Sequence, residues 1–147
     1  MRVKRPAIVL GAALAVAVLL APGSSNATGT NGYSGSTDAG GLIAIRAKFN
    51  GKGEPTTARS LRWANIPAAC QGYSPTAHSG DLKLSMKVDD KGNFSGSGEV
   101  PTGAKVTIRG RFKHHAEKAS GTFRLKGTIS GCVKADTGTL GWEMTRK

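Results

Sequence analysis

The chain has 147 residues, with 21 Lys and Arg against 9 Asp and Glu, which gives a formal net charge of +12. This length allows one domain, and two cysteines exclude both a disulfide-dense mini-scaffold and a four-cysteine zinc site. A hydrophobic content of 38% supports a modest core but not a polytopic membrane protein, and the 21 glycines follow no three-residue period, so collagen is excluded.

Residues 1–27 have the pattern of a cleaved secretory signal peptide. Three basic residues within residues 1–6 precede an apolar run over residues 7–21, and Ser25 and Ala27 are small residues at the two positions that signal peptidase reads. The apolar run is shorter than the roughly 20 residues that a membrane-spanning helix needs. No cysteine lies near the expected cleavage point, which argues against a lipoprotein anchor. We therefore expect a secreted protein that does not span the membrane after cleavage.

The two cysteines are expected to form a disulfide. Removing residues 1–27 takes away three basic residues and no acids, which lowers the net charge from +12 to +9. Secretion places the mature chain in an oxidising compartment, where Cys70 and Cys132 are bonded rather than free thiols. The bridge would close a loop of about 60 residues and stabilise the fold by roughly 4 kcal/mol in the chain-entropy model.

The mature chain is expected to be one all-β domain, residues 41–147, after a flexible segment over residues 28–40. That segment is mostly Gly, Ser and Thr, and within it residues 33–37 could form an irregular edge strand. From residue 42 onward, apolar and polar residues alternate with the period of half-buried strands. Strands are predicted over residues 42–49, 61–64, 82–88, 94–100, 105–112, 121–129 and 140–144, with a loop over residues 71–80. Seven or eight short strands predict an antiparallel β-sandwich or a small barrel.

Four glycines occupy inward positions of these strands: Gly96, Gly98, Gly110 and Gly127. One interpretation is that they make room for aromatic side chains or mark bulges. The other is that they form the floor of a small-ligand pocket, as in a carrier protein.

The sequence offers little for catalysis or metal binding. His78 lies in a segment of Pro, Ser and Gly, where a histidine is usually solvated, and His114 and His115 lie at a hairpin tip, where adjacent side chains make a poor chelate. Asp89 and Asp90 are explained by their turn. The sequence carries no nucleophile elbow, phosphate loop, dinucleotide fingerprint or zinc pattern. We therefore expect no enzymatic activity, no cofactor and no bound metal.

Charge is the most informative feature. The outward positions of the strands predicted over residues 105–112 and 121–129 hold five cations: Lys105, Arg109, Arg111, Arg124 and Lys126. Because residues of one face stay on that face for any register shift of two, these cations cluster whatever the pairing. Like charges placed opposite one another cost stability, which favours an anionic partner, although basic residues also serve solubility alone. Exposed aromatic residues are too few for a nucleic-acid stacking platform, so no specific nucleic acid is expected.

The second half of the chain resembles a known pattern. It consists of a G-x-F unit, an A-S-G-T-F run and a cysteine followed by Gly and Trp, here Gly110 and Phe112, residues 119–123, Cys132, Gly138 and Trp142. In this the chain resembles small secreted actinobacterial-type β-sandwich proteins, over roughly residues 33–145. The resemblance implies a β-sandwich with one disulfide. These proteins have no assigned function, so the resemblance carries over no functional residue.

These features predict a secreted, non-enzymatic β-domain that presents a basic face to extracellular anionic partners. The partners expected are polymers of the cell envelope or lipid headgroups, because both carry dense negative charge. A small-ligand carrier with an interior pocket and an enzyme of unknown class are the alternatives.

Overall fold

The computed structural model describes residues 29–147, which form nine strands joined by turns. Residues 1–28, which include the expected signal peptide over residues 1–27, lie outside the described residues. The strands are β1 (Thr30–Thr37), β2 (Leu42–Phe49), β3 (Pro55–Cys70), β4 (Tyr73–Lys87), β5 (Asn93–Glu99), β6 (Lys105–Lys113), β7 (Lys118–Ile129), β8 (Cys132–Asp136) and β9 (Leu140–Arg146). The all-β prediction is confirmed, with nine strands in this part of the chain instead of seven or eight.

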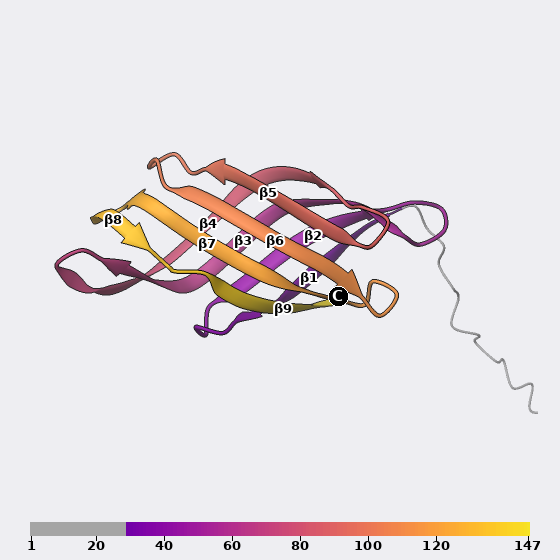
Figure 1. Cartoon of the computed structure of the whole chain (residues 1–147), viewed down its shortest axis with the longest axis horizontal. Helices are drawn as coiled ribbons and strands as arrows, with labels where there is room; N and C mark the ends of the chain where they lie inside the picture. Colours follow the sequence, from indigo (N-terminus) through magenta and orange to yellow (C-terminus); the bar gives the residue numbers. More distant parts are fainter. Residues whose placement is uncertain (1–28) are drawn as a thin grey trace, which may run out of the picture.

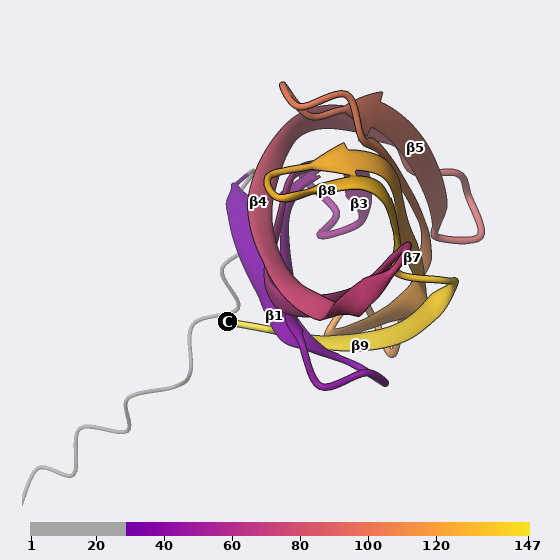
Figure 2. The same cartoon turned by 90° about the vertical axis from the view of Figure 1, so that its left-hand side faces the viewer.

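All nine strands belong to one antiparallel sheet that curls around a single core. Its order is β4-β3-β2-β1-β9-β7-β6-β5, and β8 pairs with β3 and β7 off this path. Figure 1 shows β5, β6 and β7 in front of β2 and β3, and Figure 2 shows the strands forming a ring when the molecule is turned by 90°. The two ends of the order meet through side chains, because Gly96 and Gly98 of β5 lie against Leu82 and Met86 of β4. The fold is therefore barrel-like.

The core follows from the two-residue period of the strands. In β2 the side chains of Ile43, Ile45 and Phe49 are buried, whereas Arg46 and Lys48 between them are exposed. The same alternation runs through β6 and β7. Burying a large apolar side chain contributes about 1.5–3 kcal/mol, so the inner faces of the strands hold the sheet closed.

One end of the barrel is closed by β8 and the disulfide. The short strand β8 pairs on one side with β3, where Cys70 lies opposite Ala135, and on the other side with β7, where Lys126 lies opposite Asp136. The bond between Cys70 and Cys132 joins the end of β3 to the start of β8 with a Cα–Cα distance of 5.7 Å, and the predicted disulfide is confirmed. Since β3 and β7 lie in different halves of the strand order, the bond ties these halves together.

The expectation of a flexible segment over residues 28–40 is wrong over residues 30–37, which form β1, and the strand expected over residues 33–37 is not at an edge. Strand β1 lies inside the sheet, paired with β2 on one side and with β9 on the other. The side chain of Tyr33 is 1% exposed, and its hydroxyl donates a hydrogen bond to the carbonyl of Ala116. The Gly, Ser and Thr residues of this strand show no apolar alternation, so the sequence does not reveal it. Its burial depends on the side chains of Tyr33 and Thr37, which point inward.

The loop expected over residues 71–80 is also wrong, because β4 begins at Tyr73. Strands β3 and β4 form a long hairpin that turns at Gln71 and Gly72. Pro67 lies within β3 opposite Ala77, so this strand continues past the residues 61–64 predicted for it. Pairing between β3 and β2 ends at Ala64. Position 67 therefore has no partner on β2, and the N–H that proline lacks is not required for that pairing.

The inward glycines make room for side chains. A Cβ atom at Gly96 would lie 2.6 Å from Cγ of Met86, and one at Gly110 would lie 2.6 Å from Cζ2 of Trp142. Gly98 packs in the same way against Leu82, and Gly127 has a φ of 130° where the β7–β8 register shifts. The packing and bulge interpretation is confirmed at these four positions, because side chains and backbone fill the space in front of them.

Replacing Cys70 and Cys132 together by alanine is expected to lower the free energy of unfolding by up to about 4 kcal/mol, because the unfolded chain regains the freedom of the closed loop. Urea denaturation of the parent and the double variant measures this difference. Ellman titration of the unfolded, unreduced protein should detect no thiol. A double variant as stable as the parent would contradict the structural role of the bond.

Gly121→Ala is expected to lower the free energy of unfolding by about 1–3 kcal/mol, because the added Cβ would overlap the carbonyl of Arg109 and lie 2.7 Å from Cζ2 of Trp142. Gly51→Ala is the matched control, since a Cβ at Gly51 meets nothing within 4 Å and its φ is not positive. Thermal melts of both variants decide the matter. Equal melting temperatures would show that the sheet opens to accept the methyl group at position 121.

Candidate functional site

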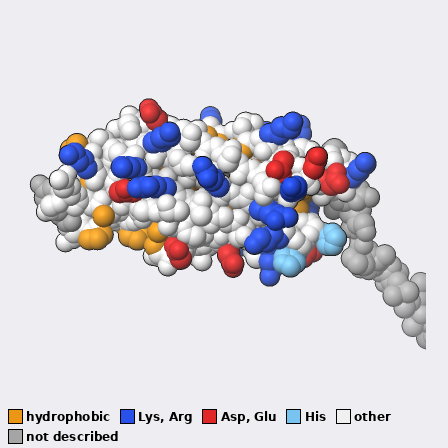
Figure 3. Space-filling view, in the orientation of Figure 1, with side chains coloured by type: hydrophobic (Ala, Val, Ile, Leu, Met, Phe, Trp, Pro, Cys, Tyr) orange, Lys and Arg blue, Asp and Glu red, His pale blue; other side chains and the backbone are white. Residues whose placement is uncertain are grey.

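The basic face is the outer surface of β6 and β7, defined by seven cations: Lys105, Arg109, Arg111, Lys113, Lys118, Arg124 and Lys126. All seven are exposed, and Phe112 and Phe123 of the same strands are buried on the other side, as the alternation predicts. Figure 3 shows Lys and Arg side chains spread across the side of the molecule that β5, β6 and β7 form in Figure 1. The five cations singled out from the sequence therefore share one surface. Whether that surface binds anions remains a prediction.

The pairing of β6 with β7 sets cations directly opposite cations. Lys105 lies opposite Lys126, and Lys113 lies opposite Lys118. Between these pairs, Arg109 lies opposite Thr122. Like charges in directly opposed positions destabilise a sheet, so the arrangement works against folding unless the charges are screened or bound.

Carboxylates reach the basic face only at its borders. Glu99 of β5 lies opposite Lys105, and Glu143 of β9 lies opposite Ser120 on β7. The one ion pair of this face within residues 29–147 joins Arg124 to Asp136, where Nε and Nη2 donate to the two carboxylate oxygens at 3.1 and 2.7 Å. The hydrogen bond from Arg124 holds the pKa of Asp136 below its ordinary value.

The Arg124–Asp136 pair changes the expected site. Arg124 forms an ion pair with a neighbouring carboxylate, so its positive charge is less available to a ligand than that of the other cations. Arg111 donates from Nε to the carbonyl of Lys91 at 3.0 Å, which orients its guanidinium without neutralising it. Sequence reasoning missed Asp136 because the strand that carries it, β8, has only five residues and no alternating pattern.

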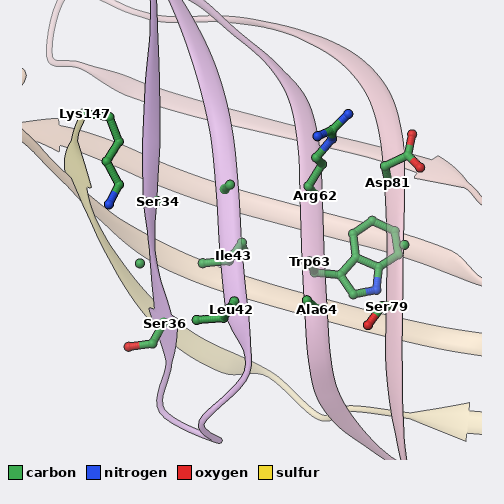
Figure 4. A pocket seen from close by; sticks show the side chains of 13 residues that line it. Ser34, Ser36, Leu42, Ile43, Arg62, Trp63, Ala64, Ser79, Asp81 and Lys147 are labelled. Atoms are coloured by element: carbon green, nitrogen blue, oxygen red, sulfur yellow. The ribbon is translucent and has the colours of Figure 1, made fainter.

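A second surface feature lies on the outside of β1 to β4. Figure 4 shows this hollow, with Ser34, Ser36, Leu42 and Ala64 along neighbouring strands and with Arg62 beside Asp81 at one rim. The side chain of Leu42 is 57% exposed there. The hollow is open and is formed mostly by small side chains, with Arg62, Asp81 and Lys147 as its charged residues.

His78 is not the solvated loop residue that its local sequence predicts. It lies on β4, half-buried, and its Nδ1 accepts a hydrogen bond from Nε1 of Trp63 at 3.0 Å. The two rings are stacked, with centroids 5.9 Å apart. Since Nδ1 is an acceptor, the imidazole is neutral in this arrangement, and burial lowers its pKa.

The remaining sequence candidates are not gathered into a metal site in the described part of the chain. His114 and His115 are exposed at the turn between β6 and β7, and residues 29–147 contain no group of three or more His, Cys, Asp and Glu side chains placed to hold a metal ion. No helix long and apolar enough to cross a membrane is present among these residues. Compared with protein-family models, curated proteins and solved structures, the chain matches none. The resemblance to small secreted β-sandwich proteins stays a prediction.

Acidification is expected to destabilise the fold through His78. In the folded protein the imidazole stays neutral to a lower pH than in the unfolded chain, where its pKa is about 6.5. Unfolding therefore takes up a proton. The contribution of His78 to the free energy of unfolding is complete above its pKa in the unfolded chain and is lost as the pH falls through its pKa in the folded protein. His78→Gln keeps an acceptor for Trp63 but does not titrate.

Urea midpoints of the parent and His78→Gln at pH 7.5 and pH 5.0 measure this effect. The parent should lose more stability on acidification than the variant, and tryptophan emission should report the same transition. Equal losses would assign the pH dependence to other groups.

Proposed function

We propose that this chain is a secreted, non-enzymatic β-domain whose basic face binds anionic polymers or lipid headgroups of the cell envelope. The observation that carries the proposal is the direct opposition of Lys105 to Lys126 and of Lys113 to Lys118. These oppositions cost stability in the free protein, partly offset at Lys105 by Glu99 and at Lys126 by Asp136, and a bound polyanion would remove the remaining cost.

The geometry favours an extended ligand. Cations at every second or fourth residue of β6 run from Lys105 to Lys113, and a strand rises about 3.3 Å per residue, so the row extends for about 26 Å. The rows on β6 and β7 lie side by side and carry hydroxyl groups, such as those of Thr107 and Thr122, between the charges. A surface of this kind offers repeated contacts to a chain of phosphates or carboxylates and no enclosure for a small molecule.

The location of the protein is supported by two features. The pattern of residues 1–27 is that of a signal peptide, and the bond between Cys70 and Cys132 is typical of proteins from oxidising compartments. A carrier with a lined interior is supported less, because Met86, Phe94 and Trp142 fill the space in front of Gly96 and Gly110.

Reversing two charges on the basic face is expected to weaken binding to isolated cell envelopes by at least about tenfold at low salt, because phosphate contacts and their salt dependence scale with the number of cations. Lys105→Glu with Arg109→Glu is preferred over changes at Arg124, which is paired with Asp136. A glutamate at position 105 would face Lys126 as an opposite charge and Glu99 as a like charge, so the two effects offset each other and stability should change by about 0.5 kcal/mol or less.

Arg46→Glu with Lys48→Glu is the matched control. Both residues are exposed on β2, which three strands separate from β6 in the sheet order, and the change in net charge is the same. Cosedimentation with envelopes at 50 mM and 500 mM salt distinguishes the outcomes. If both double variants lose binding equally, net charge and not the basic face is responsible, and if binding ignores salt and both variants, the proposal is wrong.

A further inference from the structure

The end of the barrel opposite β8 has a second concentration of charge. The turns after β2, β4 and β6 surround a hollow of about 810 Å³ there, lined by four lysines and two histidines: Lys52, Lys87, Lys91, Lys113, His114 and His115. Figure 3 shows His side chains grouped with Lys and Arg at one end of the molecule. The hollow is several times larger than a phosphate group, and it adjoins the basic face at Lys113.

The two histidines are held in a fixed and unusual turn. His114, His115 and Ala116 have φ values of 51°, 55° and 62°, three consecutive left-handed residues without a glycine. Such residues persist only where the surroundings hold them. Here the methyl group of Ala116 is buried and its carbonyl accepts the hydrogen bond from the Tyr33 hydroxyl, whose pKa burial raises to about 12, so the donor proton stays in place.

Further backbone bonds complete the support of this turn. The N–H of Glu117 donates to the carbonyl of His114 at 3.1 Å, and the N–H of Arg146 donates to the carbonyl of Glu117 at 2.8 Å. The turn is therefore held by contacts with β1 and β9 and not by its histidines. The imidazoles of both histidines are exposed, so they are accessible to a ligand.

Two of the three carboxylates that line the hollow accept hydrogen bonds within their own turns. Asp89 accepts hydrogen bonds from the side chain and backbone N–H of Asn93 and from the backbone N–H of Lys91, which hold its pKa below its ordinary value. Glu54 accepts a hydrogen bond from Nδ2 of Asn50 at 2.8 Å. The four lysines make no ion pair within 4.0 Å in the described part of the chain.

We propose that this hollow is a phosphate-binding site and that protonation of His114 and His115 strengthens its binding in mildly acidic surroundings. The proposal rests on the proposed function, since it assigns phosphate-bearing polymers as the ligand class and adds pH as a control. At neutral pH, four lysines against the three carboxylates of Glu54, Asp89 and Asp90 leave one positive charge in excess, and two imidazolium groups raise that excess to three.

The other charged groups near the turn do not cancel this gain, since Glu117, which follows the turn, lines a hollow with Lys118, Arg146 and Lys147. On its outer flank, His114 shares a shallow hollow with Lys113, Lys118 and Glu143, so the additional cation there balances the additional carboxylate. Lysine is a common ligand of phosphate as a point charge, and histidine is the side chain whose charge changes between pH 5 and 8. A ligand that keeps its negative charge over this range would therefore be bound more tightly as the pH falls.

The test uses fluorescently labelled inorganic polyphosphate as the probe, because its internal phosphates keep their charge between pH 7.5 and 5.5. Binding to the mature protein, measured by anisotropy at fixed salt, should strengthen at least about tenfold on acidification. His114→Asn with His115→Asn should reduce this gain to less than about twofold. Asparagine is chosen because it tolerates left-handed backbone, so the turn is kept.

Two further variants separate this site from the basic face. His78→Gln, which removes the third histidine, should keep the full gain, whereas Lys105→Glu with Arg109→Glu should weaken binding at both pH values and keep the ratio between them. A parent protein that binds polyphosphate equally at both pH values, or an asparagine variant that keeps the gain, would overturn the histidine site and leave the basic face intact. Absence of binding at either pH would overturn both for this class of polymer.

Discussion

The strict alternation of side chains in a sheet that closes on itself is the constraint on which the rest of the structure depends. Each strand has one inner side, so every second residue must be apolar or small enough to pack, and the residues between them face outward. In β6 and β7 both strands obey this rule over their whole length. Because the inner positions are filled by residues such as Val106 and Phe123, the basic side chains of these strands have no place but the outer surface, and pairing sets several of them against one another.

The glycines link the core to that surface. Gly110 and Gly121 lie opposite each other in the β6–β7 pair, beneath the ring of Trp142. Their lack of side chains lets the indole lie against the backbone, and this close contact fixes the segment of β6 that carries Arg109 and Arg111. A fixed backbone orients exposed cations at regular intervals, which suits a ligand with regularly spaced charges better than a flexible basic tail would.

The side of the sheet on which a side chain lies could be predicted from the sequence, whereas its neighbours on other strands could not. Alternation is a local property, so it assigned Arg109 to the outside and Phe112 to the inside before any pairing was known. The partner of Arg124 depends on where β8 lies, and β8 was not recognised because its burial does not alternate. The polar residues that flank His78 predict a solvated side chain, whereas its burial comes from Trp63, 15 residues earlier. The place of β1 inside the sheet depends on β9, at the other end of the chain.

The pairing of β1 with β9 has a consequence for how the molecule assembles. Tyr33 lies opposite Arg146, so the first and last described strands complete the sheet together, and the part of β7 from Lys118 to Phe123 gains its second neighbour only when β9 arrives. Contacts between residues so distant in sequence slow folding, since a long stretch of chain must be ordered before they form. Until then the edges of β1 and β7 are open to pairing with other chains. Lys118, at the start of the open edge of β7, disfavours such pairing in that interval, because like charges keep a second copy from adding to the unfinished sheet.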